Sequence, residues 1–243
     1  MDTAPERHRG AHPADRQLFS TRRLADLRQA TADLSWLLTR GYAPASSLKL
    51  VGDRYALKQR QRLAVGRAAC SDQHKAQRLE SRLSFESMRG EVIVIDGLNL
   101  IITMEAALSG GLLIACRDGC IRDLASVHGS YRSVNETEKA LLMVGETLAL
   151  AEPKSVLWLL DQPVSNSGRL AQRIREIAEA AHWPWTVEVV MNPDRQLRRE
   201  DRPVITSDSN ILDAPVHWIN FNAEMVERHF PQAWLLPLQE EIT

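Results

Sequence analysis

Two kinds of hydrophobic pattern divide the chain near residue 90. Before that point, apolar residues recur every three or four positions, as the leucines within 24–38 do, and this spacing predicts an amphipathic helix. Ser20 or Thr21 can cap this helix, and the helix is expected to end at Gly41, where a left-handed backbone costs little. Further helices of the same period are predicted over residues 44–55, 58–70 and 74–88. Residues 1–89 are therefore expected to form a small all-helical domain.

From Glu91 onward, short runs of consecutive apolar residues replace the helical period. Val92 to Ile95 is a β-branched run, which is typical of a strand buried on both faces. Comparable strands are predicted over residues 112–115, 119–124, 156–160, 186–191, 204–206, 218–220 and 234–236. Helical segments separate several of them, and this alternation implies parallel pairing with right-handed crossovers. We therefore predict an α/β domain over residues 90–243, with a parallel sheet and flanking helices.

Composition narrows the class of protein. The chain has 243 residues, of which 44% are hydrophobic and 25% charged, as in soluble globular proteins. It has no apolar run of the roughly 18 residues that span a membrane, and its first twenty residues lack the apolar centre of a secretory signal. Three cysteines without a CxxC pair are typical of a reducing compartment. The sequence predicts a cytoplasmic protein with no membrane partner, and a homodimer is compatible with it.

The net charge of −1 hides an asymmetry between the two halves. Residues 1–89 contain 17 Lys or Arg and 9 Asp or Glu, whereas residues 90–243 contain 13 and 22. A basic half beside an acidic half suggests that one part attracts a polyanion while the other gathers carboxylates. The alternative is that the charges are solvated or pair between the halves. The candidates for contact with a nucleic-acid backbone are Arg54, Lys58, Arg60, Arg62 and Arg67. The alternative for these residues is that Arg54 pairs with a neighbouring acid such as Asp53 and that the others are solvated.

Three predicted strands lead into an aspartate, namely Asp96, Asp161 and Asp208. In an open parallel sheet, ligands bind beyond the carboxyl ends of the strands, so residues distant in sequence can meet there. Crowded carboxylates raise one another's pKa and normally need a cation, and oxygen ligands select Mg²⁺ or Mn²⁺. Such an ion can activate water for phosphodiester hydrolysis. The alternative for each aspartate alone is a cap on the following turn or helix.

Several weaker candidates surround these aspartates. Asn99 could orient a water, bind phosphate or cap the next helix, and Asp213 could share the metal ion. Ser165, Asn166 and Ser167 lead into a helix whose amides could receive a phosphate, although they are also ordinary cap residues. By contrast, we interpret Asp194 and Asp118 as turn residues.

The strand-end residues resemble the PIN-like nuclease superfamily, including its NYN branch. The resemblance rests on Val92–Asn99, which reads VIVIDGLN, on Asp161, and on Ile205–Asp208, which reads ITSD. It implies a parallel α/β fold in which acidic residues bind metal ions and hydrolyse RNA. Those roles fall on Asp96, Asp161 and Asp208, with Asn99 and Asp213 beside them. Glu138 is the nearest candidate for the glutamate that this superfamily often carries on a central helix.

The N-terminal half resembles an uncharacterised prokaryotic domain that precedes a PIN-like domain in a two-part family. The matching positions are His12-Pro13 with Asp15, Leu37–Tyr42 and Leu50–Tyr55. The working hypothesis is a metal-dependent endoribonuclease that acts on RNA. The alternative is a non-catalytic RNA- or protein-binding module that retains the fold. A phosphatase with a nucleophilic aspartate is disfavoured, because the residue two positions after Asp96 is Leu98 and not a second acid.

Overall fold

Helices occupy most of the N-terminal third. The computed structural model describes residues 9–125, 131 and 134–239. Its first helices are α1 (Asp15–Leu18), α2 (Thr21–Thr39), α3 (Pro44–Arg54), α4 (Gln59–Ala68) and α5 (Asp72–Glu80). The predicted boundaries of the long helix are confirmed, since α2 follows Ser20 and Gly41 has a φ of +78°. The leucine stripe of α2 is buried at Leu27 and Leu34, against Val51 of α3 and Val65 of α4.

The predicted helix over residues 74–88 is wrong in its second half. The chain leaves α5 after Glu80, forms a two-residue strand β1 (Arg82–Leu83) and continues as a 3-10 helix η1 (Phe85–Met88). Strand β1 pairs in parallel with β8 (Trp218–Ile219) at the edge of the large sheet. Leu83 and Phe85 pack on the core of the α/β region. Pairing with a distant strand thus overrides the local helical period.

A six-stranded parallel sheet forms the centre of the C-terminal region, so the predicted fold class is confirmed. Its order is β1-β8-β7-β2-β5-β6. The strands not yet bounded are β2 (Val92–Asp96), β5 (Ser155–Asp161), β6 (Trp185–Val190) and β7 (Val204–Ile205). The helices that follow the strands are α6 (Gly97–Leu108), α7 (Thr137–Leu150), α8 (Ser167–Ala180), α9 (Pro193–Leu197), α10 (Ser209–Leu212) and α11 (Phe221–His229).

Alternate residues of the central strands enter cores on opposite faces of this sheet. Ile93 and Ile95 pack with residues of α6, α7, α8 and α11, whereas Val94 packs with residues of α9 and α10. Both sets of side chains are out of contact with water. The continuous apolar run in β2 is explained by this burial on two faces.

The strand order reverses at β2. From β2 the chain goes to β5 and then β6 on one side, and later to β7 and β8 on the other. All neighbouring pairs are parallel, so the carboxyl ends of β5, β2 and β7 lie side by side. The switch point of a parallel sheet is where such folds bind ligands.

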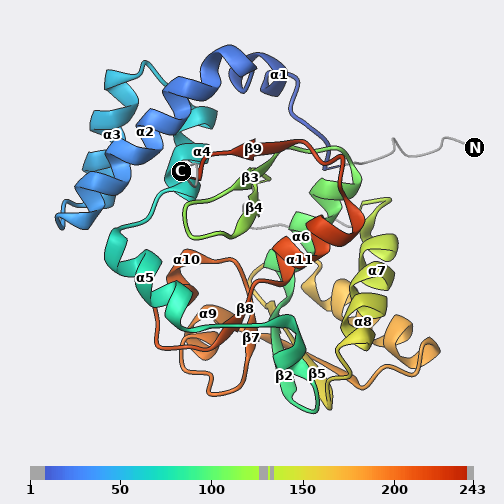
Figure 1. Cartoon of the computed structure of the whole chain (residues 1–243). Helices are drawn as coiled ribbons and strands as arrows, with labels where there is room; N and C mark the ends of the chain where they lie inside the picture. Colours follow the sequence, from blue (N-terminus) through green and yellow to red (C-terminus); the bar gives the residue numbers. More distant parts are fainter. Residues whose placement is uncertain (1–8, 126–130, 132–133, 240–243) are drawn as a thin grey trace, which may run out of the picture.

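A second sheet connects the helical region to the rest of the chain. The predicted hairpin is confirmed as β3 (Leu113–Ala115) and β4 (Ile121–Asp123), and Gly119 in its turn has a φ of +80°. The predicted last strand, β9 (Leu235–Pro237), pairs with β3 and lies outside the large sheet. Leu112, Ile114 and Leu236 share one hydrophobic core with α2 and α4. The three strands accordingly lie between the N-terminal helices and α6 with α11 (Figure 1).

No helix in the described part of the chain is both long enough and apolar enough to cross a membrane.

Candidate active site

The carboxyl ends of the central strands carry the predicted aspartates. Asp96 is the last residue of β2 and pairs in register with Leu159, two positions before Asp161 at the end of β5. Asp208 follows β7 after Thr206 and Ser207, and stands directly before α10. The fold therefore brings these three residues to one end of the sheet at the switch point. Asp96 is buried, whereas Asp161 and Asp208 are half-buried.

A single hydroxyl connects Asp96 to the Asp208 backbone. Thr206 Oγ1 donates to Asp96 Oδ2 at 2.8 Å. Thr206 Oγ1 also accepts from the Asp208 amide at 3.0 Å. Asp208 Oδ1 accepts from the Asn210 amide at 2.7 Å and so caps α10. Asp208 therefore caps α10 with one carboxylate oxygen, and its second carboxylate oxygen remains for other contacts.

The electrostatics show that four carboxyl groups influence one another here. Burial raises the pKa of Asp96 to about 8; the Thr206 hydroxyl opposes this, and the charges of Asp208, Asp194 and Asp161 add to it. Burial also raises the pKa of Asp161, as do Asp194 and Asp208. We call Asp96, Asp161, Asp194 and Asp208 the acid edge.

Asp194 is the member that the sequence interpretation missed. The sequence predicts a turn residue at this position, but Asn192 makes the capping contact of α9, with Oδ1 accepting from the Arg195 amide at 2.8 Å. Partial desolvation and Asp208 raise the pKa of Asp194, whereas Arg198 lowers it. The signal was present in the sequence, because Asp194 comes a few residues after the end of β6, as Asp208 comes a few residues after the end of β7.

The donor chemistry of the acid edge suits a hard divalent cation in an open site. Within the described residues, no three His, Cys, Asp or Glu side chains are placed to hold one metal ion. The expected convergence of Asp96, Asp161 and Asp208 on one ion is thus not present among the described residues. Mg²⁺, however, usually binds through one or two carboxylates and completes its shell with waters and substrate phosphates. The all-oxygen groups present fit that mode of binding.

Asp213 does not belong to the acid edge. Arg78 donates to Asp213 Oδ1 from Nε at 2.9 Å and from Nη2 at 2.5 Å, and His74 Nδ1 lies 3.2 Å from Oδ2. Arg78 also bonds to the buried Asp118 at 2.5 Å. The carboxylate of Asp213 is occupied by this ion-pair network, and the structure gives no support for the predicted metal role.

Asn99 holds the neighbouring strand end in place. Its Oδ1 accepts from Ser207 through both the amide, at 2.9 Å, and the hydroxyl, at 3.0 Å. It lies in the first turn of α6 and does not cap that helix, whose N-cap is Asp96. Because its oxygen is occupied, the amide nitrogen is the part of Asn99 that remains for a ligand.

The predicted phosphate loop makes contacts inside the protein. Asn166 has a φ of +69°, and its Nδ2 donates to the Tyr131 carbonyl at 2.7 Å. The Ser165 carbonyl accepts from the Tyr131 amide at 3.1 Å. Ser167 Oγ is buried and has no hydrogen-bond partner among the described residues. Ser165 and Asn166 therefore serve to hold Tyr131, which explains their pattern without a phosphate.

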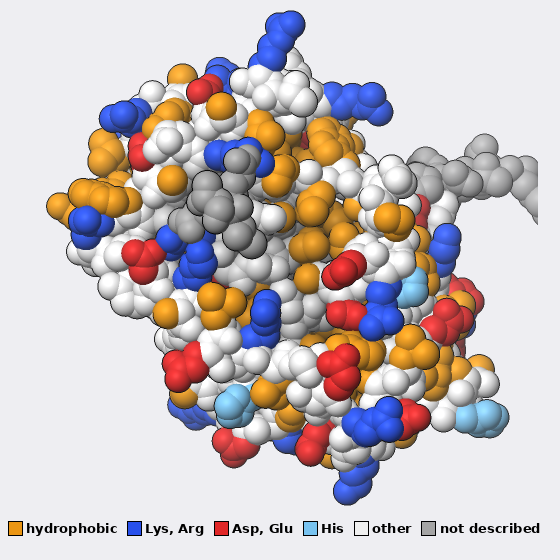
Figure 2. All heavy atoms as spheres, in the orientation of Figure 1, with side chains coloured by type: hydrophobic (Ala, Val, Ile, Leu, Met, Phe, Trp, Pro, Cys, Tyr) orange, Lys and Arg blue, Asp and Glu red, His pale blue; other side chains and the backbone are white. Residues whose placement is uncertain are grey.

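Three candidate arginines of the helical region already form ion pairs with acidic residues, namely Arg54, Arg60 and Arg62. Arg60 binds the buried Asp15, with Nη2 to Oδ2 at 2.8 Å, and Arg62 binds Asp53 at 2.7 Å. Arg54 lies 3.6 Å from Asp33 and is 71% exposed. Over the face shown in Figure 2, basic and acidic side chains are interspersed. These pairs form within the helical region and not between the two halves, so pairing with nearby acids accounts for all three arginines.

Glu138 lies on the outer surface of α7. Its Oε2 is 2.5 Å from Arg173 Nη2 of α8, and both side chains are largely exposed. The pairing of two exposed side chains across neighbouring helices explains this residue. The fourth acid near the strand ends is Asp194 and not Glu138.

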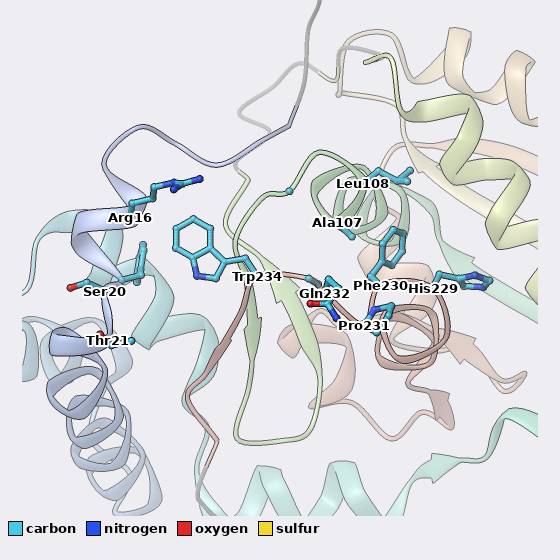
Figure 3. Close-up of a pocket in the computed structure, with 13 residues that line it drawn as sticks. Arg16, Ser20, Thr21, Ala107, Leu108, His229, Phe230, Pro231, Gln232 and Trp234 are labelled. Carbon is cyan, nitrogen blue, oxygen red and sulfur yellow. The ribbon is translucent and has the colours of Figure 1, made fainter.

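A cavity of about 890 Å³ lies apart from the acid edge. Arg16 and the start of α2 form one side of it, and the end of α6 with the segment after α11 forms the other (Figure 3). Trp234 and Phe230 supply aromatic surface to its walls. The residues that line it include none of the predicted site residues.

Comparison with known proteins identifies relatives whose activity is not known. Residues 85–224 match the family model described as "Domain of unknown function (DUF5616)", and residues 26–80 match "Protein of unknown function (DUF434)". An uncharacterized protein of Methanocaldococcus jannaschii is 33% identical over 186 residues, covering 76% of this chain and 88% of the relative. No solved structure matches. These matches agree with the two-part architecture of unknown function expected from the sequence, and they do not name a nuclease.

Proposed function

Because the chain belongs to the DUF5616 family, whose description names no activity, we propose its function from the acid edge: a metal-dependent endoribonuclease of the PIN-like type. The proposed reaction is hydrolysis of RNA phosphodiester bonds with Mg²⁺ or Mn²⁺. Asp96 and Asp208 are the proposed metal ligands, and Asp161 and Asp194 supply the surrounding negative charge.

One contrast carries the proposal. Asp118 and Asp96 are both buried aspartates, but Asp118 has two arginine partners, Arg122 and Arg78. These guanidinium groups outweigh burial and lower the pKa of Asp118 to about 2. Asp96 has a threonine hydroxyl and three nearby acids, and its pKa rises to about 8. A buried carboxyl that the protein leaves uncompensated at a ligand-binding edge is typical of a functional group.

A bound divalent ion would neutralise the carboxylates and polarise the phosphodiester for attack by water. The chain itself orients the acids. Thr206 fixes one oxygen of Asp96, and the two bonds from Ser207 to Asn99 hold the β7 end against α6. Asn222 Nδ2 donates to Ser207 Oγ at 3.1 Å, so the residue before Asp208 is held from a third direction.

The primary test is a cleavage assay with purified protein and labelled single-stranded RNA. Cleavage in Mg²⁺ or Mn²⁺ that stops with excess chelator is expected. The rival, a binding module that retains the fold, predicts RNA affinity that falls steeply with salt and no metal-dependent turnover. RNA that stays intact in every metal tested would contradict the nuclease proposal.

Replacing Thr206 by Val tests the orientation of the acids. The change removes a donor to Asp96 and an acceptor for the Asp208 amide while keeping the side-chain volume. We expect cleavage activity to fall by about 10- to 100-fold, as is usual for groups that orient metal ligands. The matched control is Thr31→Val, a buried threonine of α2 whose hydroxyl donates to the Leu27 carbonyl. Equal loss in both variants would indicate a general effect on stability and not on the site.

A further inference from the structure

A cleft of about 360 Å³ opens beside Asp208, between the helical region and the acid edge. Gly66 and Arg67 of α4 line one side, and Ser207 to Asn210 line the other. Asn99 of α6 lies in its lining as well. The cleft is thus the place where the N-terminal helices reach the proposed catalytic groups.

One buried guanidinium fixes the two walls relative to each other. Arg122 Nη1 donates to the Arg67 carbonyl at 3.1 Å, and Arg122 Nε donates to the Ser207 carbonyl at 2.7 Å. Asp118 holds the same guanidinium with bonds of 3.0 and 2.7 Å. Because Arg122 is buried and fully engaged, the cleft is formed before any ligand arrives.

Arg67 is the cation of the helical region that lies in this cleft. Its Nη1 bonds to the Asp123 carbonyl and its Nη2 to the Ala125 carbonyl at 3.3 Å, and its side chain is 30% exposed. The Asp123 carboxylate, which also lines the cleft, forms an ion pair with Nη1 at 3.5 Å. It accepts in addition from the Ala125 amide and from Thr103. The guanidinium has five N–H donors, so donors remain after these contacts.

We infer that this cleft binds the phosphodiester backbone of single-stranded RNA next to the bond that is cut. The inference rests on the proposed function for its ligand. Arg67 supplies charge from one wall, and the amide nitrogen of Asn99 supplies a neutral donor from another. A single strand is the expected form, because its unstacked nucleotides can enter a cleft whereas an A-form duplex presents a regular outer surface. Of the basic residues that the sequence predicts to contact RNA, Arg67 is the one that lines this cleft.

Substitution of Asn210 tests RNA binding in the cleft without removing a side-chain contact of the fold. It is exposed, it lines the cleft, and its contacts are made by its backbone amide and carbonyl. We expect Asn210→Lys to tighten and Asn210→Asp to weaken the binding of fluorescent single-stranded RNA, each by about 2- to 5-fold, as for one exposed charge contact. Binding is measured by fluorescence anisotropy in chelator, so that cleavage plays no part.

Arg67→Gln provides the second measurement. Loss of one phosphate contact should weaken binding about tenfold and reduce the slope of log affinity against log salt by about 0.7. Arg67→Lys keeps the charge and should retain most of the affinity and the slope. The control pair is Gln172→Lys and Gln172→Glu, at an exposed position of α8 outside the cleft. These should leave binding unchanged.

The outcomes separate this inference from the proposed function. Wild-type affinity in both Asn210 variants and in Arg67→Gln would overturn the cleft inference, even if the protein cleaves RNA. A similar shift in the Gln172 pair, or equal affinity for a duplex of the same sequence, would also overturn it. Affinity that follows the charge at Asn210, in a protein without metal-dependent cleavage, would support the cleft and reject the nuclease.

Discussion

Asp96→Asn is expected to lower the rate of metal-dependent RNA cleavage by about 1000-fold, because a bound ion contributes several kcal/mol to such a reaction. Asparagine has nearly the same shape and can still accept from Thr206, so the fold should remain intact. The change removes the buried carboxyl group that would give up its proton and bind the proposed ion. The rate is measured under single-turnover conditions with saturating protein, so that weaker RNA binding does not enter.

A matched control for this loss is Glu138→Gln. Glu138 is also an acid of the α/β region, but it lies on the surface in a pair with Arg173. We expect the cleavage rate of Glu138→Gln to stay within about twofold of the wild-type rate, since exposed ion pairs contribute little. Cleavage by Asp96→Asn at the wild-type rate, or cleavage that persists in excess chelator, would reject the metal mechanism.

The second large effect is a fall in the stability of the metal-free protein as pH rises from 5 to 8. The pKa of Asp96 is about 8 in the folded chain, against an ordinary value of 3.8. In that window the folded state holds a proton that the unfolded chain has released. The free energy of unfolding should therefore decrease with pH, by up to about 1.4 kcal/mol per pH unit for this one group. Asp161 and Asp194, whose pKa values are also raised, act in the same direction.

Asp118 does not contribute to the change in stability between pH 5 and 8. Its pKa is lowered to about 2, so its contribution to stability is complete above the ordinary value and is lost only as pH falls toward 2. Urea unfolding in chelator at pH 5, 6, 7 and 8 measures the slope. Asp96→Asn should flatten it, and Mg²⁺ should stabilise the wild type more at pH 8 than at pH 5. Two results would contradict a buried Asp96 without a compensating charge. One is a free energy of unfolding that is constant from pH 5 to 8, and the other is an equal slope against pH in Asp96→Asn.

The sequence was sufficient for elements whose pattern is local. The apolar run before Asp96 predicts β2 because both faces of that strand are buried. The sequence was insufficient where pairing between strands distant in the chain decides the structure. Arg82–Leu83 continues a helical period, yet becomes a strand through contact with Trp218–Ile219. Likewise, nothing local indicates that Leu235–Pro237 leaves the large sheet and pairs with β3.

The same distinction explains the candidate site. Asp96, Asp161 and Asp208 could be placed together because parallel strands order their ends. The partners of charged residues could not be predicted, because tertiary structure selects them: Arg78 for Asp213, and Asp15 for Arg60. Counting charges therefore overstated the basic surface of the helical region. Whether carboxyl groups surround a single ion depends on differences of an ångström, which no sequence pattern reports.

Binding of Mn²⁺ tests the central claim most directly, since it requires neither a known RNA substrate nor turnover. Electron paramagnetic resonance can count the ions bound at pH 7.5 by the wild type, Asp96→Asn and Glu138→Gln. Saturable binding is expected in the wild type and in Glu138→Gln, and its loss is expected in Asp96→Asn. A wild type that binds no Mn²⁺, or an Asp96→Asn variant that binds it equally well, would show that the acid edge is not a metal site.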